Sequence, residues 1–334
     1  MFEYSYREWL IFFYIYSFLG WCFESAYVSL TEKKPVNRGF LRSPLLPLYG
    51  NGACIMLFIA MPSRSSHLLT YLIGALGATL LELITGIGME GIFKVKYWDY
   101  SNKKYNYKGV ICLSSSLFWG ALTLILIDVM QPRVETLLRY ADPALLDRVL
   151  KVLNITFALD CILSTKAALD FAKALSALDR VKSELSQLQL RLSLLRETVR
   201  DSAANTLLSA GEHIGQMADN VLSLRPPAEH LFAVKERAFN MIAAIKAEIE
   251  TRLSQNGFEP KISMEYKKIL EVLNSLKKSL PSSNRVLTFF RRGMLKGNPD
   301  ATSPYPEAFD EFKENEIQAK KLQREKRRQK KRKK

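Results

Sequence analysis

Up to about residue 169 the chain alternates long apolar runs with short basic loops, and a different pattern follows. A helix needs about 20 mostly apolar residues to cross the hydrocarbon core of a bilayer. The runs at residues 9–30, 68–93 and 111–130 therefore predict three transmembrane helices, and weaker runs at residues 45–61 and 149–168 predict two more. The predicted fold class is all-α, a polytopic membrane bundle of about five helices within residues 1–170.

The two weaker runs are weak for different reasons. Residues 45–61 are few and are bounded by Pro47 and Pro62, so a re-entrant segment is the alternative to a full crossing. Residues 149–168 carry Asp160 and Lys166, and a charge at mid-helix costs about 2.5 to 3.5 kcal/mol on an insertion scale. Hydrophobicity alone does not decide either crossing.

The charges of the loops favour five crossings. Lysine and arginine concentrate at residues 31–44 and 94–108, whereas Arg64 is the only strong base in the turn between residues 61 and 68. The positive-inside rule places both basic loops, and the basic C-terminal tail, in the cytoplasm. Only an odd number of crossings joins that tail to an external N-terminus. We therefore expect a multi-pass protein of the cell membrane with its N-terminus outside.

Beyond residue 170 the apolar positions follow a helical period. Between residues 178 and 199 they recur at alternating spacings of three and four, as in a coiled coil, and a second stripe occupies residues 231–249. We predict a coiled-coil helical hairpin over residues 171–256, with homodimerisation as the alternative. A basic helical or disordered tail is expected over residues 257–334.

The C-terminal region is rich in bases. The run at residues 285–296 combines two phenylalanines with four bases, and the chain ends in REKRRQKKRKK. Both features predict contact with anionic lipid headgroups. RNA is the rival partner, because charge alone does not distinguish one polyanion from another.

Acidic side chains within the apolar runs are the leading candidates for a functional site, because ionisable groups at membrane depth usually face a bundle interior or an aqueous cavity. These intramembrane candidates are Glu24, Glu82, Glu90 and Asp160. Glu82 and Glu90 are eight residues apart, which places them on one helix face. Three readings stay open: structural pairing with arginines, an ion or substrate pathway, and acid–base catalysis.

Two cytoplasmic loops are patterned more strongly than simple connectors. Proline and glycine punctuate residues 35–52, which favours fixed turns, and tyrosines and lysines alternate at residues 94–108. The candidate site in these loops comprises Asn37, Arg38, Arg42, Trp98 and Asp99. The four cysteines are isolated from one another and from histidine, so the sequence predicts no metal site and no cofactor.

Several of these segments carry a resemblance to a known family. The stretches NRGFLRSPLLPLYGNG (37–52), LLELITG (80–86), WDYS (98–101) and CLSSSLFWG (112–120) resemble the bacterial integral membrane family described as putative ABC-transporter type IV. The resemblance covers roughly residues 10–170. It implies a permease-like subunit that works with a separate nucleotide-binding ATPase, since the chain has no GxxxxGK[ST] loop of its own.

The sequence thus favours a non-enzymatic transport or membrane-assembly component of unknown substrate. The alternatives are an intramembrane enzyme acting on a lipid or envelope precursor through Glu24, Glu82 or Glu90, and a membrane scaffold that does not transport.

Overall fold

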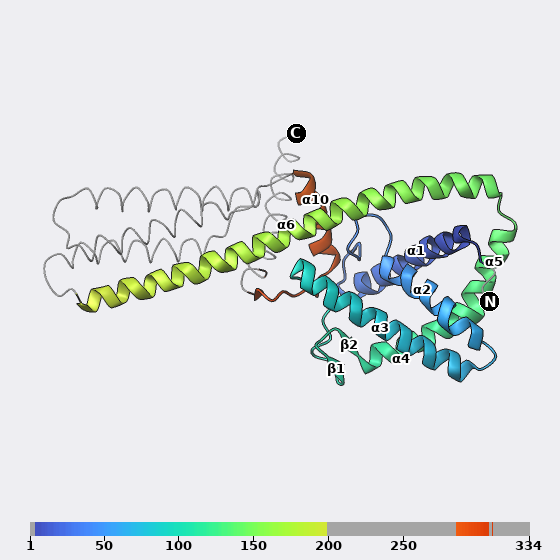
Figure 1. Cartoon of the computed structure of the whole chain (residues 1–334), viewed down its shortest axis with the longest axis horizontal. Helices are drawn as coiled ribbons and strands as arrows, with labels where there is room; N and C mark the ends of the chain where they lie inside the picture. Colours follow the sequence, from blue (N-terminus) through green and yellow to red (C-terminus); the bar gives the residue numbers. More distant parts are fainter. Residues whose placement is uncertain (1–3, 199–284, 307–308, 310–334) are drawn as a thin grey trace. The chain divides into compact units, whose positions relative to one another are not determined.

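The computed structural model describes residues 4–198, 285–306 and 309 of the chain (Figure 1). The chain forms two compact units, one made of residues 1–172 and 285–304 and the other of residues 173–284 and 305–334. All candidate site residues belong to the first unit. The described part of the second unit is mainly the continuation of the long helix α6.

Helices account for most of the described structure, and a short antiparallel β-hairpin lies between two of them (Figure 1). The helices are α1 (Tyr6–Thr31), α2 (Pro47–Ala60), α3 (His67–Phe93), α4 (Leu113–Ile125), α5 (Gln131–Arg139), α6 (Pro143–Thr198) and α10 (Arg285–Gly297), with strands β1 (Asn106–Tyr107) and β2 (Ile111–Cys112). A 3-10 turn (Met61–Ser63) follows α2, and a π-helical stretch (Leu126–Met130) joins α4 to α5.

The described residues contain four helices that are long and apolar enough to cross a membrane: Tyr6–Thr31, His67–Phe93, Leu113–Arg139 and Pro143–Lys173. They cover four of the five predicted runs, including the charged run at residues 149–168. The fifth run, at residues 45–61, forms the 14-residue helix α2. At 1.5 Å per residue α2 is about 21 Å long, so it is too short to cross the hydrocarbon core alone.

Large apolar side chains cover the outside of this unit. Leu30, Leu76 and Ile155 are 80, 72 and 63% exposed, although each belongs to one of the four long helices. A water-soluble protein rarely leaves an apolar surface of this extent uncovered. The exposed apolar surface therefore supports a membrane location.

The core of the bundle lies where α1, α2, α3 and α4 pack together around Phe12 and Leu57, both fully buried. Glycines allow this close approach, since a Cβ on Gly20 would overlap the Tyr49 ring and one on Gly74 would overlap Thr123. At its N-terminus α1 is held by a capping box, in which the Ser5 backbone N–H donates to the Glu8 carboxylate (2.7 Å).

Helix α2 begins beside the middle of α1 and runs antiparallel to the N-terminal half of that helix. The Leu46 backbone N–H donates to the Ser17 carbonyl (3.0 Å), and at the other end of α2 the Tyr4 hydroxyl contacts the Met61 sulfur (3.8 Å). The non-helical segment at residues 32–46 therefore lies beside the remaining half of α1. Segment and helix together extend along the whole of α1.

Much of the predicted tail lies outside the described residues. Helix α6 continues as one helix to Thr198, in agreement with the helical period at residues 178–199. The stripe at residues 231–249 and the terminal basic run are not among the described residues. The coiled-coil hairpin over residues 171–256 and the contacts of the tail over residues 257–334 with lipid or RNA stay predictions.

Candidate functional site

Two serines of α1 hold the backbone of the non-helical segment. Ser29 Oγ accepts a hydrogen bond from the Val36 N–H (2.9 Å), and Ser25 Oγ accepts one from the Arg38 N–H (3.1 Å). Irregular backbone is tolerated at membrane depth only where protein or enclosed water satisfies its polar groups. These side-chain acceptors let residues 32–46 leave helical geometry beside a transmembrane helix.

Asp160, one of the predicted intramembrane acids, supports the same segment from α6. Its carboxylate accepts hydrogen bonds from the backbone N–H groups of Arg42 (3.2 Å) and Ser43 (2.7 Å) and from the Ser164 hydroxyl (3.0 Å). Asp160 is only 9% exposed. Asp160 therefore serves as a buried acceptor for two backbone amides that have no helical partner.

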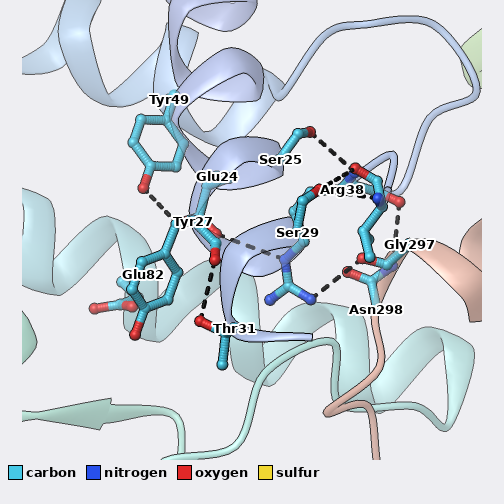
Figure 2. Close-up of polar contacts among 12 residues, drawn as sticks. Glu24, Ser25, Tyr27, Ser29, Thr31, Arg38, Tyr49, Glu82, Gly297 and Asn298 are labelled. Atoms are coloured by element: carbon cyan, nitrogen blue, oxygen red, sulfur yellow. Dashed lines mark hydrogen bonds and ion pairs between the residues drawn. The ribbon is translucent and has the colours of Figure 1, made fainter. Parts of the chain in front are cut away.

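Glu24 lies at the centre of an ion-paired cluster between α1, the segment at residues 32–46 and α2. The Arg38 guanidinium lies 3.6 Å from one carboxylate oxygen, and the Tyr49 hydroxyl donates to the other (2.6 Å). In Figure 2 the two partners approach Glu24 from opposite sides. The side chains of Glu24 and Arg38 keep 25% and 12% of their surface exposed, so this pair is accessible.

Glu82 is the most buried of the predicted acids, with 4% of its surface exposed. Its carboxylate accepts three hydrogen bonds, each 3.2 Å long, from the Tyr100 hydroxyl, the Ser115 hydroxyl and the Trp119 indole N–H. Within the described residues it has no basic ion-pair partner. Burial and the nearby Glu82 carboxylate raise the pKa of Tyr100, so that hydroxyl stays a hydrogen-bond donor at neutral pH.

Tyr49 connects the two acids. Its hydroxyl reaches Glu24, and its ring packs on the Trp119 ring with centroids 5.2 Å apart, while the indole of Trp119 donates to Glu82. The structure thus brings Glu24, Arg38 and Glu82 into one cluster, joined by the contact between the Tyr49 and Trp119 rings, which we call the Glu24–Glu82 network. It lies where α2 begins.

The structure places Glu90 elsewhere. Its carboxylate faces the Lys96 ammonium at 3.9 Å, two turns beyond Glu82 on α3. The shared helix face predicted from the spacing does not bring the two acids to common partners. Through its ion pair with Lys96, Glu90 stabilises the start of the loop between α3 and α4.

Trp98 and Asp99 stabilise the loop between α3 and α4. The Trp98 indole N–H donates to the Val110 carbonyl (2.8 Å), and the Asp99 carboxylate accepts from the Ser101 N–H (2.9 Å) and hydroxyl (2.5 Å). Although burial alone would raise the pKa of Asp99, these bonds lower it below its ordinary value. Both residues have structural contacts inside their own loop.

The C-terminal segment at residues 285–304 returns to the first unit and contacts the candidate loop site. The Arg38 guanidinium donates to the Gly297 carbonyl (3.4 Å), and the Asn298 amide donates to the Gly39 carbonyl (3.1 Å), as Figure 2 shows around Arg38. Arg38 therefore contacts both Glu24 and a residue 259 positions later in the chain.

Arg42 and Asn37 join in this packing. The Arg42 guanidinium lies over the Phe289 ring at 4.2 Å, and Asn37 accepts a hydrogen bond from the Trp21 indole (2.5 Å).

The sequence predicts a membrane-surface helix at residues 285–296. In the structure Met294 of this segment is 3% exposed, and its sulfur accepts a hydrogen bond from the buried Tyr97 hydroxyl, while contact of the segment with lipid stays a prediction.

Sequence reasoning missed the hydrogen-bond donors that complete the Glu24–Glu82 network. These are Tyr49, Tyr100, Ser115 and Trp119. All four fall inside the stretches that carry the family resemblance, and that was the available signal. Within the described residues, no group of three or more histidine, cysteine, aspartate or glutamate side chains could hold a metal ion.

The fold and the site define a membrane protein with several long apolar helices, one short helix that begins beside the middle of another, and a buried polar network at that point. Residues 11–165 match the model of the family described as "Putative ABC-transporter type IV", the same family that the motifs resemble. No curated protein and no solved structure matches the chain.

Proposed function

We propose that the protein is the permease-like component of a membrane transporter and that its substrate path passes the Glu24–Glu82 network. The observation that carries this proposal is the position of α2. This short helix starts beside the middle of α1, after a non-helical segment, and Glu24 and Glu82 lie at that start. Secondary transporters commonly build midplane binding sites at such discontinuous helices.

The same arrangement supports five crossings. Helix α2 is too short to cross alone, but residues 32–46 provide the missing length beside α1 and have their amides satisfied by Ser25, Ser29 and Asp160. The crossing therefore consists of a half-helix and an extended half. With the four long helices it gives an external N-terminus and a cytoplasmic tail, in accord with Lys33 and Lys34 at the end of α1 and with the basic loop at residues 94–108, while Arg38 and Arg42 become part of the crossing.

The network offers both signs of charge to a substrate. Arg38 and Glu24 are paired but partly exposed, and Glu82 is held by neutral donors only. A charged substrate that replaces one partner supplies the counter-charge of the other, and a substrate with both charges would pair with both at once. The substrate class that fits is small and polar, with at least one charge.

Cysteine accessibility tests the path. In a chain without its native cysteines, we expect Glu24→Cys and Glu82→Cys to react with membrane-impermeant thiol reagents from both faces of the membrane, because an alternating path is open to each face in turn. Glu90→Cys, on the same helix as Glu82 but outside the network, is the matched control and should react from the cytoplasmic face only.

Ser65→Cys and Lys104→Cys fix the orientation in the same experiment, as external and cytoplasmic references. Labelling of positions 24 and 82 from one face only would contradict transport and favour the intramembrane enzyme, for which Glu24, Tyr49 and Arg38 would form a one-sided acid–base site. No labelling from either face would favour the scaffold.

A separate ATPase is the second expectation. Because the chain has no phosphate-binding GxxxxGK[ST] loop, an ABC-type mechanism needs a partner subunit that binds the nucleotide. Crosslinking in intact cells followed by purification should recover a nucleotide-binding protein, and Lys103→Glu with Lys104→Glu in the basic loop should reduce its recovery. The matched charge reversal Arg133→Glu, on α5, should leave recovery unchanged. Purification that recovers no nucleotide-binding protein would contradict the ABC-type assignment.

A further inference from the structure

A second polar site lies at the other end of the bundle, away from the Glu24–Glu82 network. A cavity of about 600 Å³ opens between the N-terminal end of α1, the turn after α2, the end of α5 and the start of α6. Its wall contains three arginines and two glutamates, namely Arg7, Arg64, Arg139, Glu8 and Glu135, together with apolar side chains from the three helices and the turn.

Both acids of this cavity already have donors. Glu8 closes the capping box with Ser5 at 2.7 and 2.8 Å. Glu135 accepts hydrogen bonds from the Tyr4 hydroxyl and from the Gln131 amide (3.2 Å). Burial, together with this bond to Glu135, raises the pKa of Tyr4 to about 12, so Tyr4 stays a neutral donor. These donors are uncharged, so both carboxylates keep their charge, but within the described residues neither of them forms an ion pair with an arginine.

The arginines are not equally engaged. Arg7 pairs with Asp147 at 3.3 Å. Within the part of the chain that the structure describes, the guanidinium groups of Arg64 and Arg139 have neither an ion-pair partner nor a hydrogen-bond acceptor. Two planar groups with unused N–H donors therefore line one cavity, and guanidinium binds phosphate oxygens in a bidentate manner.

Aromatic rings near the cavity indicate its position relative to the membrane surface. Tyr4, Trp9 and Phe12 form an edge-to-face cluster with centroids 5.0 to 5.9 Å apart. Tyrosine and tryptophan concentrate at the level of the lipid headgroups. The cavity therefore combines an apolar wall, a nearby aromatic cluster and two guanidinium groups without partners among the described residues. These features together fit a molecule that has a phosphate at the membrane surface and an apolar part below it.

We propose that this cavity binds the phosphate of an anionic phospholipid, with Arg64 and Arg139 as its ligands. The bidentate contacts orient the headgroup, and the apolar wall receives the first part of an acyl chain. This site is independent of the proposed transport path, because it shares no residue with the Glu24–Glu82 network.

Photocrosslinking tests the proposal on the full chain in nanodiscs. A photoreactive phosphatidylglycerol should label peptides that contain residues 4–12, 61–64 and 135–146, and Arg64→Gln combined with Arg139→Gln should reduce that labelling by roughly tenfold or more. Any labelling of the basic C-terminal tail should not change and provides an internal reference. Arg133→Gln, on α5 but not part of the cavity wall, is the matched control.

Three results would overturn the proposal. They are equal labelling of the cavity peptides in the double variant, equal labelling by a photoreactive phosphatidylcholine, and full competition by inorganic phosphate at millimolar concentration. The last result would assign the site to a soluble anion. Arg64→Lys with Arg139→Lys keeps the charges without the planar fork and should retain part of the labelling, which separates lost binding from lost folding.

Discussion

Replacement of Asp160 by alanine is expected to destabilise the bundle by about 3 to 5 kcal/mol. The carboxylate accepts hydrogen bonds from the Arg42 and Ser43 amides in a segment that has no helical partners for them. Each hydrogen bond to a charged group contributes about 1.5 to 3 kcal/mol, and the buried amides would be left unsatisfied. The cost of holding the charge at depth does not offset this loss, because Asp160 is also inside the membrane before the helices pack.

Unfolding of the purified protein in mixed detergent micelles measures this effect. Asp160→Asn retains an acceptor oxygen and should lose only about 1 to 2 kcal/mol. Asp128→Ala is the control, since Asp128 is a partly exposed acid that faces His67 at 3.4 Å, and it should lose less than about 1 kcal/mol. Equal stability of Asp160→Ala and the wild type would show that the segment at residues 32–46 does not depend on this anchor.

The sequence was sufficient for the long helices and insufficient for the non-helical segment at residues 32–46. Apolar runs of membrane length identify α1, α3, the α4–α5 span and the first part of α6, because each helix satisfies its own backbone. Residues 32–46 are not helical, so they do not satisfy all of their backbone hydrogen bonds within the segment. Their geometry depends on acceptors from α1 and α6, which no local pattern of residues 32–46 reveals.

The candidate site was predicted in part for a similar reason. Because burying an acid is energetically costly, the sequence pointed to Glu24, Glu82 and Asp160. The structure gives Glu24 one hydrogen-bond donor and one arginine, and it gives Glu82 and Asp160 three donors each. Spacing placed Glu90 with Glu82, but a neighbouring lysine supplies the partner of Glu90. The contact between Arg38 and Gly297 joins residues 259 positions apart, and a local sequence pattern does not predict a contact over such a separation.

Gly50→Ala is expected to destabilise the protein by about 3 kcal/mol, although alanine is normally the better helix former. A Cβ at position 50 would overlap the Ser17 hydroxyl and the backbone carbonyl of Phe13, and a backbone group cannot turn away as a side chain does. Helix α2 would have to move away from α1. Because Tyr49 precedes this position, the hydrogen bond from Tyr49 to Glu24 would weaken as well.

Gly88→Ala is the matched control, because a Cβ at Gly88 has no heavy atom within 4 Å. On helix propensity alone this variant should be as stable as the wild type or more stable by about 0.5 to 1 kcal/mol. The two variants add the same methyl group to a membrane-half helix, so their difference isolates the contact between α1 and α2. If Gly50→Ala also changes the labelling of Glu24→Cys while Gly88→Ala does not, the packing at Gly50 positions the Glu24–Glu82 network as well as stabilising the fold. If both variants unfold alike, α2 does not approach α1 as closely as the structure has it, and the broken crossing loses its support.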